Sequence, residues 1–185
     1  MDIKTNFKTW LVLANHSANL DELKLETMTR PLKVGRVSTP DNLNSMTLGQ
    51  MIELSELHNG SEMFYKVCSV LLGMSVKEVN KAAAVEVVRF VGWVAGSVKR
   101  INNLFDSVKN KPTKEEVQAG INRLNYGIFG LIDWYAKRMG IADHDEVLGV
   151  HWGRVYQCLK MDNETVEFQK RLNKIYADEV KSKRK

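Results

Sequence analysis

Four histidines and two cysteines are the residues of this chain whose chemistry could serve catalysis or metal binding. They are His16, His58, His144, His151, Cys68 and Cys158. No two histidines have the HExxH spacing, and the cysteines lack the CxxC spacing of zinc and redox pairs. Both cysteines lie in apolar stretches of helical type, so we expect them to be reduced structural residues that behave as small hydrophobic side chains.

The segment ADHDEVLG is the one place where neighbouring polar side chains suggest a metal site. Asp143, His144, Asp145 and Glu146 follow one another there, but consecutive residues at a helix start point in different directions and do not converge on one ion. We interpret them as a capping cluster, which the helix dipole favours. Asp133, beside Trp134, is interpreted as a hydrogen-bonded polar residue at the edge of the core.

The common catalytic and phosphate-binding motifs are also missing from the sequence. It contains no GxSxG, kinase or deaminase signature, and neither GxGxxG nor GxxxxGK[ST] occurs. The sequence therefore predicts no catalytic, cofactor-binding or metal-binding residue, and we expect a protein that is not an enzyme.

Apolar residues step by four and three along two segments, which places one stripe on one face of a helix. The first seam comprises Val87, Val91, Val94, Val98, Ile101, Phe105 and Val108, and the second comprises Val117, Ile121, Leu124, Ile128, Leu131 and Tyr135. We expect two long antiparallel helices, over about residues 81–109 and 113–140. The glycine pairs Gly92/Gly96 and Gly120/Gly127 are interpreted as strips where a neighbouring helix approaches closely.

Capping signals place four helix starts along the rest of the chain. A Thr, Ser or Asp stands three residues before a Gln or Glu at Thr47/Gln50, Ser75/Glu78, Thr113/Glu116 and Asp143/Glu146. The helix over 113–140 is expected to end at Gly140. A broken segment is expected over about 144–160, followed by a last helix that Asp162 or Asn163 opens.

Residues 1–46 differ in composition from the rest of the chain. A short helix is expected after Asn6, then alternating residues from Leu23 typical of an edge strand, then an extended stretch punctuated by Pro31, Gly35 and Pro40. Such a segment is too poor in apolar residues to build its own core. We therefore predict three parts: an extended N-terminal arm with short strands (1–46), a helical bundle (47–162) and an amphipathic basic C-terminal helix (163–185).

Both ends of the chain are predicted to contact other proteins. The arm offers isolated apolar anchors, and the last helix offers basic residues beside an apolar face formed by Phe168, Leu172, Ile175, Tyr176 and Val180. A solvated face with a frayed tail is the alternative interpretation of the basic residues. The predicted interaction residues are Phe7, Trp10, Leu11, Leu23, Leu25, Val34, Lys170, Arg171, Lys174, Lys181, Lys183, Arg184 and Lys185.

The overall charge is mildly basic. The 185 residues carry a formal net charge of +5, well short of the Lys and Arg density of a dedicated nucleic-acid binder. A partner with an acidic surface is equally compatible with this balance. Apolar runs are short and interrupted by charge, so the sequence predicts no membrane-spanning segment.

Five strings of the sequence carry a resemblance to a known class of proteins. They are SMTLGQMIELSEL, FYKVCSVLLGMS, VQAGINRLNYGIFGLIDWYAKRMGIADHDEVLG, HWGRVYQCLKMD and EFQKRLNKIY, within about residues 45–176. They resemble small helical proteins from the structural gene clusters of tailed bacteriophages that infect Bacteroidetes, including crAss-like phages. The resemblance implies a neck component that forms a ring between portal and tail, or a tail-assembly chaperone that never enters the virion. No catalytic residue carries over from it.

These observations together predict a mostly α-helical, non-enzymatic phage virion protein, a head–tail connector or neck-ring subunit that joins portal and tail. An extended arm and a charged helix suit a subunit that clasps its neighbours, which favours the connector over the tail-assembly chaperone. A host nucleic-acid-binding or regulatory helical protein is the remaining alternative. Expected partners are further copies in a ring, portal or tail proteins, and DNA phosphate at the basic end. We expect no membrane, cofactor or small-molecule substrate, and location in the virion after assembly in the host bacterial cytoplasm.

Overall fold

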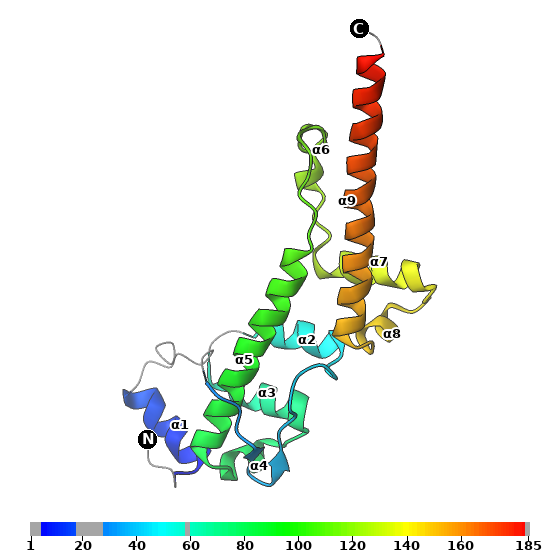
Figure 1. Cartoon of the computed structure of the whole chain (residues 1–185). Coiled ribbons are helices and arrows are strands. Elements are labelled where there is room, and N and C mark those ends of the chain that lie inside the picture. The colour runs from blue at the N-terminus through cyan, green and yellow to red at the C-terminus, as the bar shows by residue number, and fades with distance from the viewer. Residues whose placement is uncertain (1–4, 18–27, 58–59, 184–185) are drawn as a thin grey trace. The chain divides into compact units, whose positions relative to one another are not determined.

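The protein is mostly α-helical, as the sequence predicts. The computed structural model describes residues 5–17, 28–57 and 60–183 (Figure 1). The chain forms two compact units, Met1–Asn103 and Leu104–Lys185, and their boundary falls inside the helix α5 (Ala84–Ser107). We call them the N-terminal unit and the C-terminal unit. This division differs from the predicted boundaries at 46/47 and 162/163.

The N-terminal unit consists of short helices gathered on the first part of α5, together with one small hairpin. Its elements are α1 (Phe7–Ser17), β1 (Lys33–Val34), β2 (Val37–Ser38), α2 (Leu48–Ser55), α3 (Ser61–Leu72) and α4 (Val76–Lys81). Thr47 and Ser75 form complete capping boxes with Gln50 and Glu78, which confirms both predicted helix starts. Gly73 ends α3 in the left-handed conformation that glycine adopts without strain.

The first apolar seam forms the centre of the N-terminal unit. Val87, Val91, Val94 and Val98 are all buried, and Ile101 continues the same stripe to the end of this unit. Leu48, Phe64 and Val67 bring the buried faces of α2 and α3 into the same core. The prediction of a long buried helix is confirmed here, although it begins after a break at Ala82 rather than at residue 81.

The first helix packs onto the N-terminal unit and is not part of an extended arm. Its backbone is joined to the start of α5 by hydrogen bonds from the amide of Phe7 to the carbonyl of Ala82 (2.9 Å) and from the amide of Ala84 to the carbonyl of Thr5 (3.0 Å). The ring of Phe7 is fully buried, 5.3 Å between centroids from Phe64. The short helix predicted after Asn6 is therefore confirmed, and an aromatic cluster holds it to the body of the N-terminal unit.

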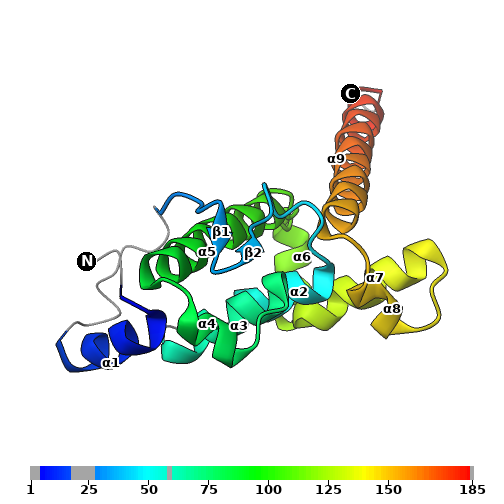
Figure 2. The ribbon, with the colours of Figure 1, turned by 90° about the horizontal axis from the view of Figure 1, so that it is seen from below.

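The two short strands β1 and β2 form an antiparallel hairpin, in a stretch for which the sequence predicts strand or extended chain. Val34 pairs with Val37, and Gly35 makes the turn at a φ of +59°. The amide of Gly35 donates to the carboxylate of Glu86 on α5 at 2.8 Å, and Figure 2 shows the hairpin beside that helix. The edge strand predicted from Leu23 lies outside the described residues.

The C-terminal unit contains the end of α5 followed by further helical segments. They are α6 (Lys114–Gln118), a 3-10 turn η3 (Ile121–Arg123), α7 (Gly127–Met139), α8 (His144–Leu148) and α9 (Trp152–Ser182). Thr113 and Glu116 form the predicted capping box, and Gly140 ends α7 as predicted. Tyr135, Val147 and Val155 are the most deeply buried side chains of this unit.

The second long helix predicted over 113–140 does not form. The chain is interrupted at Gly120 and Gly127, whose φ angles are +89° and +53°, and residues 124–126 are not helical. Because the seam crosses these breaks, its members do not share one face. Val117, Leu124 and Ile128 are exposed, whereas Tyr135 is buried. The four-and-three spacing is present, but the helical segment stops at Gly120 and a separate helix begins at Gly127.

The last helix begins earlier than predicted and is continuous. The chain breaks at Gly149, but α9 then runs from Trp152 through Gly153, Asp162 and Asn163 without interruption. Gly153 lies in the first turn, where a glycine costs little. The boundary predicted at 162/163 therefore falls in the middle of one helix.

Substitution of Gly127 tests the origin of these breaks. An ideal Cβ at Gly127 meets no atom within 4 Å, so a close-packed strip is not the reason for this glycine. Its φ of +53° strains any L side chain, and we expect Gly127→Ala to lower the free energy of unfolding by about 1–2 kcal/mol. Gly127→Leu should cost about the same, as measured by urea denaturation.

Gly153→Ala is the matched control for this prediction. Gly153 also has open space around its missing Cβ, but it lies in α9 without a positive φ. The alanine should therefore leave stability unchanged or raise it slightly. Equal losses in both variants would contradict the conformational explanation.

Candidate interaction surface

Both cysteines are free thiols, Cys68 buried and Cys158 half-buried. Cys68 is buried in the N-terminal unit, and this burial raises the pKa of its thiol to about 12. The thiol is therefore protonated at neutral pH and is a poor nucleophile. Among the residues that the structure describes, no three His, Cys, Asp or Glu side chains could together hold a metal ion.

Asp133 and His144 join α7 to α8. The Nζ of Lys137 donates to Asp133 Oδ2 at 2.7 Å, and His144 Nε2 lies 3.5 Å from Asp133 Oδ1. The hydrogen bond from Lys137, together with the charges of Lys137 and His144, holds the pKa of the Asp133 carboxyl below its usual range. Asp143 caps α8 by accepting from the amide of Asp145 at 2.9 Å. Asp143 therefore caps a helix start, as the sequence predicts, but it accepts from the amide of Asp145 and forms no capping box with Glu146.

The apolar anchors predicted in the arm lie mostly inside the N-terminal unit. Phe7, Leu11 and Val34 are buried, and Trp10 is partly buried against the ring of Phe64, 5.9 Å between centroids. In this fold they contact the chain itself, so they are not available as surface anchors. Leu23 and Leu25 lie outside the described residues.

The predicted basic residues of α9 fall into two groups. Lys170 is partly buried, with its Nζ 3.5 Å from Glu167 Oε1 and 3.9 Å from Glu116 Oε2. It therefore ties α9 to the start of α6. The exposed group comprises Arg171, Lys174, Lys181 and Lys183. Arg184 and Lys185 lie outside the described residues.

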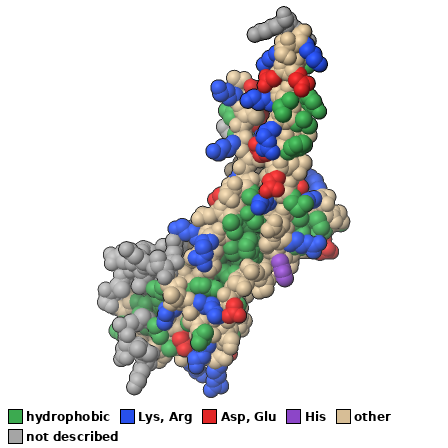
Figure 3. Space-filling view, viewed as in Figure 1, with side chains coloured by type: hydrophobic (Ala, Val, Ile, Leu, Met, Phe, Trp, Pro, Cys, Tyr) green, Lys and Arg blue, Asp and Glu red, His purple; other side chains and the backbone are tan. Residues whose placement is uncertain are grey.

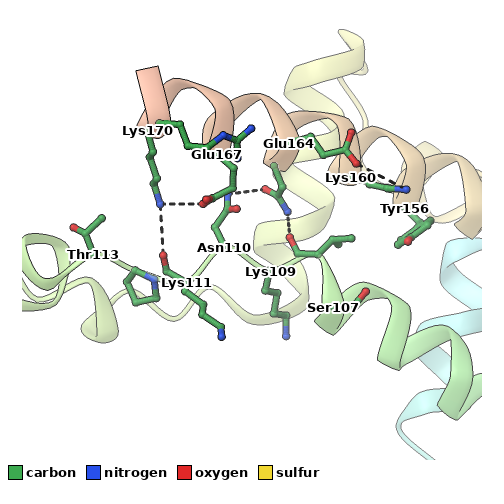
Figure 4. A pocket seen from close by; sticks show the side chains of 14 residues that line it. Ser107, Lys109, Asn110, Lys111, Thr113, Tyr156, Lys160, Glu164, Glu167 and Lys170 are labelled. Carbon is green, nitrogen blue, oxygen red and sulfur yellow. Dashed lines mark hydrogen bonds and ion pairs between the residues drawn. The ribbon is translucent and has the colours of Figure 1, made fainter. Parts of the chain in front are cut away.

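A cavity of about 780 Å³ lies between α9 and the segment that follows α5. Asn163 donates to the carbonyl of Val108, and Asn110 Nδ2 donates to Asn163 Oδ1 at 3.1 Å. Figure 4 shows Lys170 directed toward Glu167 and toward the backbone of Lys111, whereas the side chains of Lys109 and Lys111 point away from α9. The polar groups around this cavity mainly hold the segment in place.

Asn163 is the residue that we expect to control this segment. Asn163→Ala removes both hydrogen bonds and leaves the carbonyl of Val108 without its donor, so it should lower the free energy of unfolding by about 1–3 kcal/mol. Amide hydrogen exchange over 108–113 should accelerate at the same time. Asn173→Ala is the matched control, since Asn173 is exposed and bonded to the side chain of Gln169. Faster exchange in both variants would contradict the role of Asn163.

Exposed apolar side chains of the C-terminal unit run along one side of α9, from Met161 to Tyr176. We call it the α9 stripe, and its members are Met161, Phe168, Leu172, Ile175 and Tyr176. Met161, Phe168, Ile175 and Tyr176 are each 54–58% exposed. Figure 3 shows hydrophobic side chains on the outer side of this helix. The sequence predicts an apolar face on this helix. The interaction residues predicted on the helix, however, are the basic residues beside that face and not its apolar side chains.

A second group of exposed apolar residues lies within residues 117–139, where the predicted second long helix is interrupted. Val117, Ile121, Leu124, Tyr126, Ile128, Phe129 and Met139 are all at least 38% exposed. Scattered apolar residues are normal on a protein surface, but contiguous groups typically mark contacts with other molecules. The C-terminal unit therefore presents more uncovered apolar surface than its small core would suggest.

Comparison of the chain with protein-family models, with curated proteins and with solved structures gives no match. In the part of the chain that the structure describes, no helix is both long and apolar enough to cross a membrane.

Proposed function

We propose that this chain is a non-enzymatic assembly protein of a tailed bacteriophage, specifically a head–tail connector or neck-ring subunit that joins portal and tail in the virion. The α9 stripe is the observation that carries the proposal. Four large apolar side chains on one helix, each more than half exposed, lose favourable burial in an isolated chain and regain it in an assembly. The phage identity rests on the resemblance of residues 45–176 to phage structural proteins.

The charges near the stripe supply specificity for such an assembly. Arg171, Lys174, Lys181 and Lys183 are exposed on the same half of α9, interspersed with Asp178 and Glu179. Mixed charges around an apolar strip suit the rim of a protein interface, where they favour one partner and orientation. Contact with DNA phosphate is a weaker proposal, because the acidic residues reduce the local positive charge.

A tail-assembly chaperone is the second candidate, and the position of α1 favours it. The sequence favours the connector because residues 1–46 could clasp a neighbouring subunit, yet Phe7, Leu11 and Val34 are buried within the chain's own N-terminal unit. What remains exposed is an apolar helix face, which is the kind of surface that a chaperone offers to a client.

Mass spectrometry of purified virions and of the infected-cell lysate separates the two candidates. A connector should be present in virions in a fixed number of copies, in proportion to the portal protein. A chain abundant in the lysate and missing from virions would contradict the connector and support the chaperone. Phe168→Glu combined with Ile175→Glu should reduce the yield of complete particles, whereas Val166→Glu, on another face of α9, should not.

A further inference from the structure

The free end of α9 is a helix without tertiary support. Every side chain from Asn173 to Lys183 is exposed, so this stretch is not packed against the rest of the described chain. Isolated helices of this length are marginal in water, and amphipathic ones gain most of their stability from packing. The apolar side of this end therefore suits a helical partner.

The spacing of the α9 stripe is that of a pairing helix. Met161, Phe168 and Ile175 are seven residues apart, and Thr165, Leu172 and Glu179 fall between them in steps of four and three. This is the heptad pattern of helices that pack along a shared seam. At about 100° per residue, Phe168 lies roughly 160° around the helix from Trp152, which is buried in the C-terminal unit. The seam therefore faces away from the unit's own core.

We infer that α9 pairs in antiparallel orientation, along the α9 stripe, with α9 of a second copy of this chain. In this arrangement Leu172 packs against Ile175 of the second copy, and the two helices overlap over about residues 162–183. Arg171 of each copy then faces Asp178 of the other. Asp162, whose Oδ1 lies 3.1 Å from the guanidinium of Arg138 in its own chain, also faces Lys183 of the other copy. These two kinds of opposite-charge contact each occur twice, because the pairing is symmetric.

A parallel pairing fits the same stripe less well. It places Glu179 against Glu179 of the second copy inside the seam, and it offers one kind of opposite-charge contact, between Asp178 and Lys183. In the antiparallel register, Glu179 lies beside Phe168 instead, where its methylene groups cover the ring while its carboxylate reaches water. Charge complementarity therefore favours a second copy of α9 as the partner, and it favours the antiparallel over the parallel orientation.

This inference rests on the proposal that the α9 stripe is an assembly surface. It adds that, in the purified protein, this surface binds the same surface of a second copy. It is independent of whether the chain enters the virion. Dimerisation is measured on purified protein, so its failure is distinguishable from a failure of the proposed function.

Sedimentation equilibrium of the full chain tests the pairing. The protein should be monomeric at low micromolar concentration and dimeric at hundreds of micromolar. Phe168→Glu combined with Ile175→Glu should raise the dissociation constant by at least about a hundredfold, since both charges fall in the seam. Val166→Glu is the matched control: Val166 is 42% exposed on the same helix but outside the seam, and the dissociation constant should stay unchanged. Far-UV circular dichroism of the dilute proteins verifies that the fold is retained.

Exchange of two charges tests the direction of pairing. Arg171→Asp alone and Asp178→Arg alone should each weaken the dimer about tenfold, because each places like charges together twice. The double variant carries the same charges in exchanged positions and should restore the original dissociation constant. In a parallel pair it would not, because Arg at position 178 would meet Lys183.

Concentration-dependent dimerisation, its loss in the seam variant alone and its restoration by charge exchange would together support the inference. A chain that stays monomeric, a dimer equally sensitive to Val166→Glu, or a double variant that stays weakened would overturn it. A monomeric chain that is nevertheless found in virions would overturn the pairing and leave the proposed function standing.

Discussion

Replacing Phe7 by Ala lowers the free energy of unfolding by about 3–5 kcal/mol, which is the usual cost of removing a buried aromatic ring. Phe7 is fully buried in contact with Phe64, Tyr65 and Trp10, with ring centroids 5.3, 5.6 and 5.6 Å away. Truncation leaves a cavity that rigid neighbouring rings fill poorly. Urea denaturation of the full chain, followed by far-UV circular dichroism, measures the loss.

Lys8→Ala is the matched control for Phe7→Ala. Lys8 lies next to Phe7 in α1 but is exposed, and alanine keeps the helix propensity, so stability should change by less than about 0.5 kcal/mol. If Phe7→Ala costs less than about 1 kcal/mol, α1 is held only weakly. The arm would then again be available to a neighbouring subunit, which would strengthen the connector over the chaperone.

The helix starts could be predicted from the sequence because capping is a local interaction. Thr47, Ser75 and Thr113 each accept from the amide three residues later, and the Gln or Glu at that position reaches back. The buried face of α5 could also be predicted, because apolar residues recur at steps of four and three along an uninterrupted buried helix. In both cases the residues that determine the structure are close to one another in the sequence.

Features that depend on a competing local conformation or on distant contacts could not be predicted in the same way. The seam over 117–135 has helical spacing, but the chain turns at Gly120, and a new helix begins at Gly127, whose amide donates to the side chain of Asn125 at 3.1 Å. The docking of α1 depends on Phe64, which lies 57 residues further along the chain. Asn163 was predicted as a helix cap, whereas its side chain instead holds the segment after α5.

The position of the interaction surface also differs from the prediction for a physical reason. The arm is poor in apolar residues, so the sequence predicts that its few apolar side chains are anchors for another subunit. Phe7, Leu11 and Val34 are used within the chain because a small helical unit needs large apolar side chains for its own core. On α9 the opposite holds: the N-terminal turns bury Trp152 and Val155, and the later turns keep Phe168 and Ile175 exposed. One helix therefore serves both the core and the proposed assembly.

Tyr135→Ala should destabilise the C-terminal unit by about 3–5 kcal/mol, because its ring is 1% exposed at the centre of a core that has few other large buried side chains. Tyr126→Ala makes the same chemical change in the same unit, at a ring that is 68% exposed, and should cost less than about 0.5 kcal/mol. Thermal unfolding of both variants measures the difference. Similar losses would mean that Tyr126 is covered in solution, as it would be if the exposed apolar residues over 117–139 already bind a second molecule. A large loss for Tyr135 alone would instead mean that the core of this unit is small but complete, and that its exposed apolar residues are free for assembly.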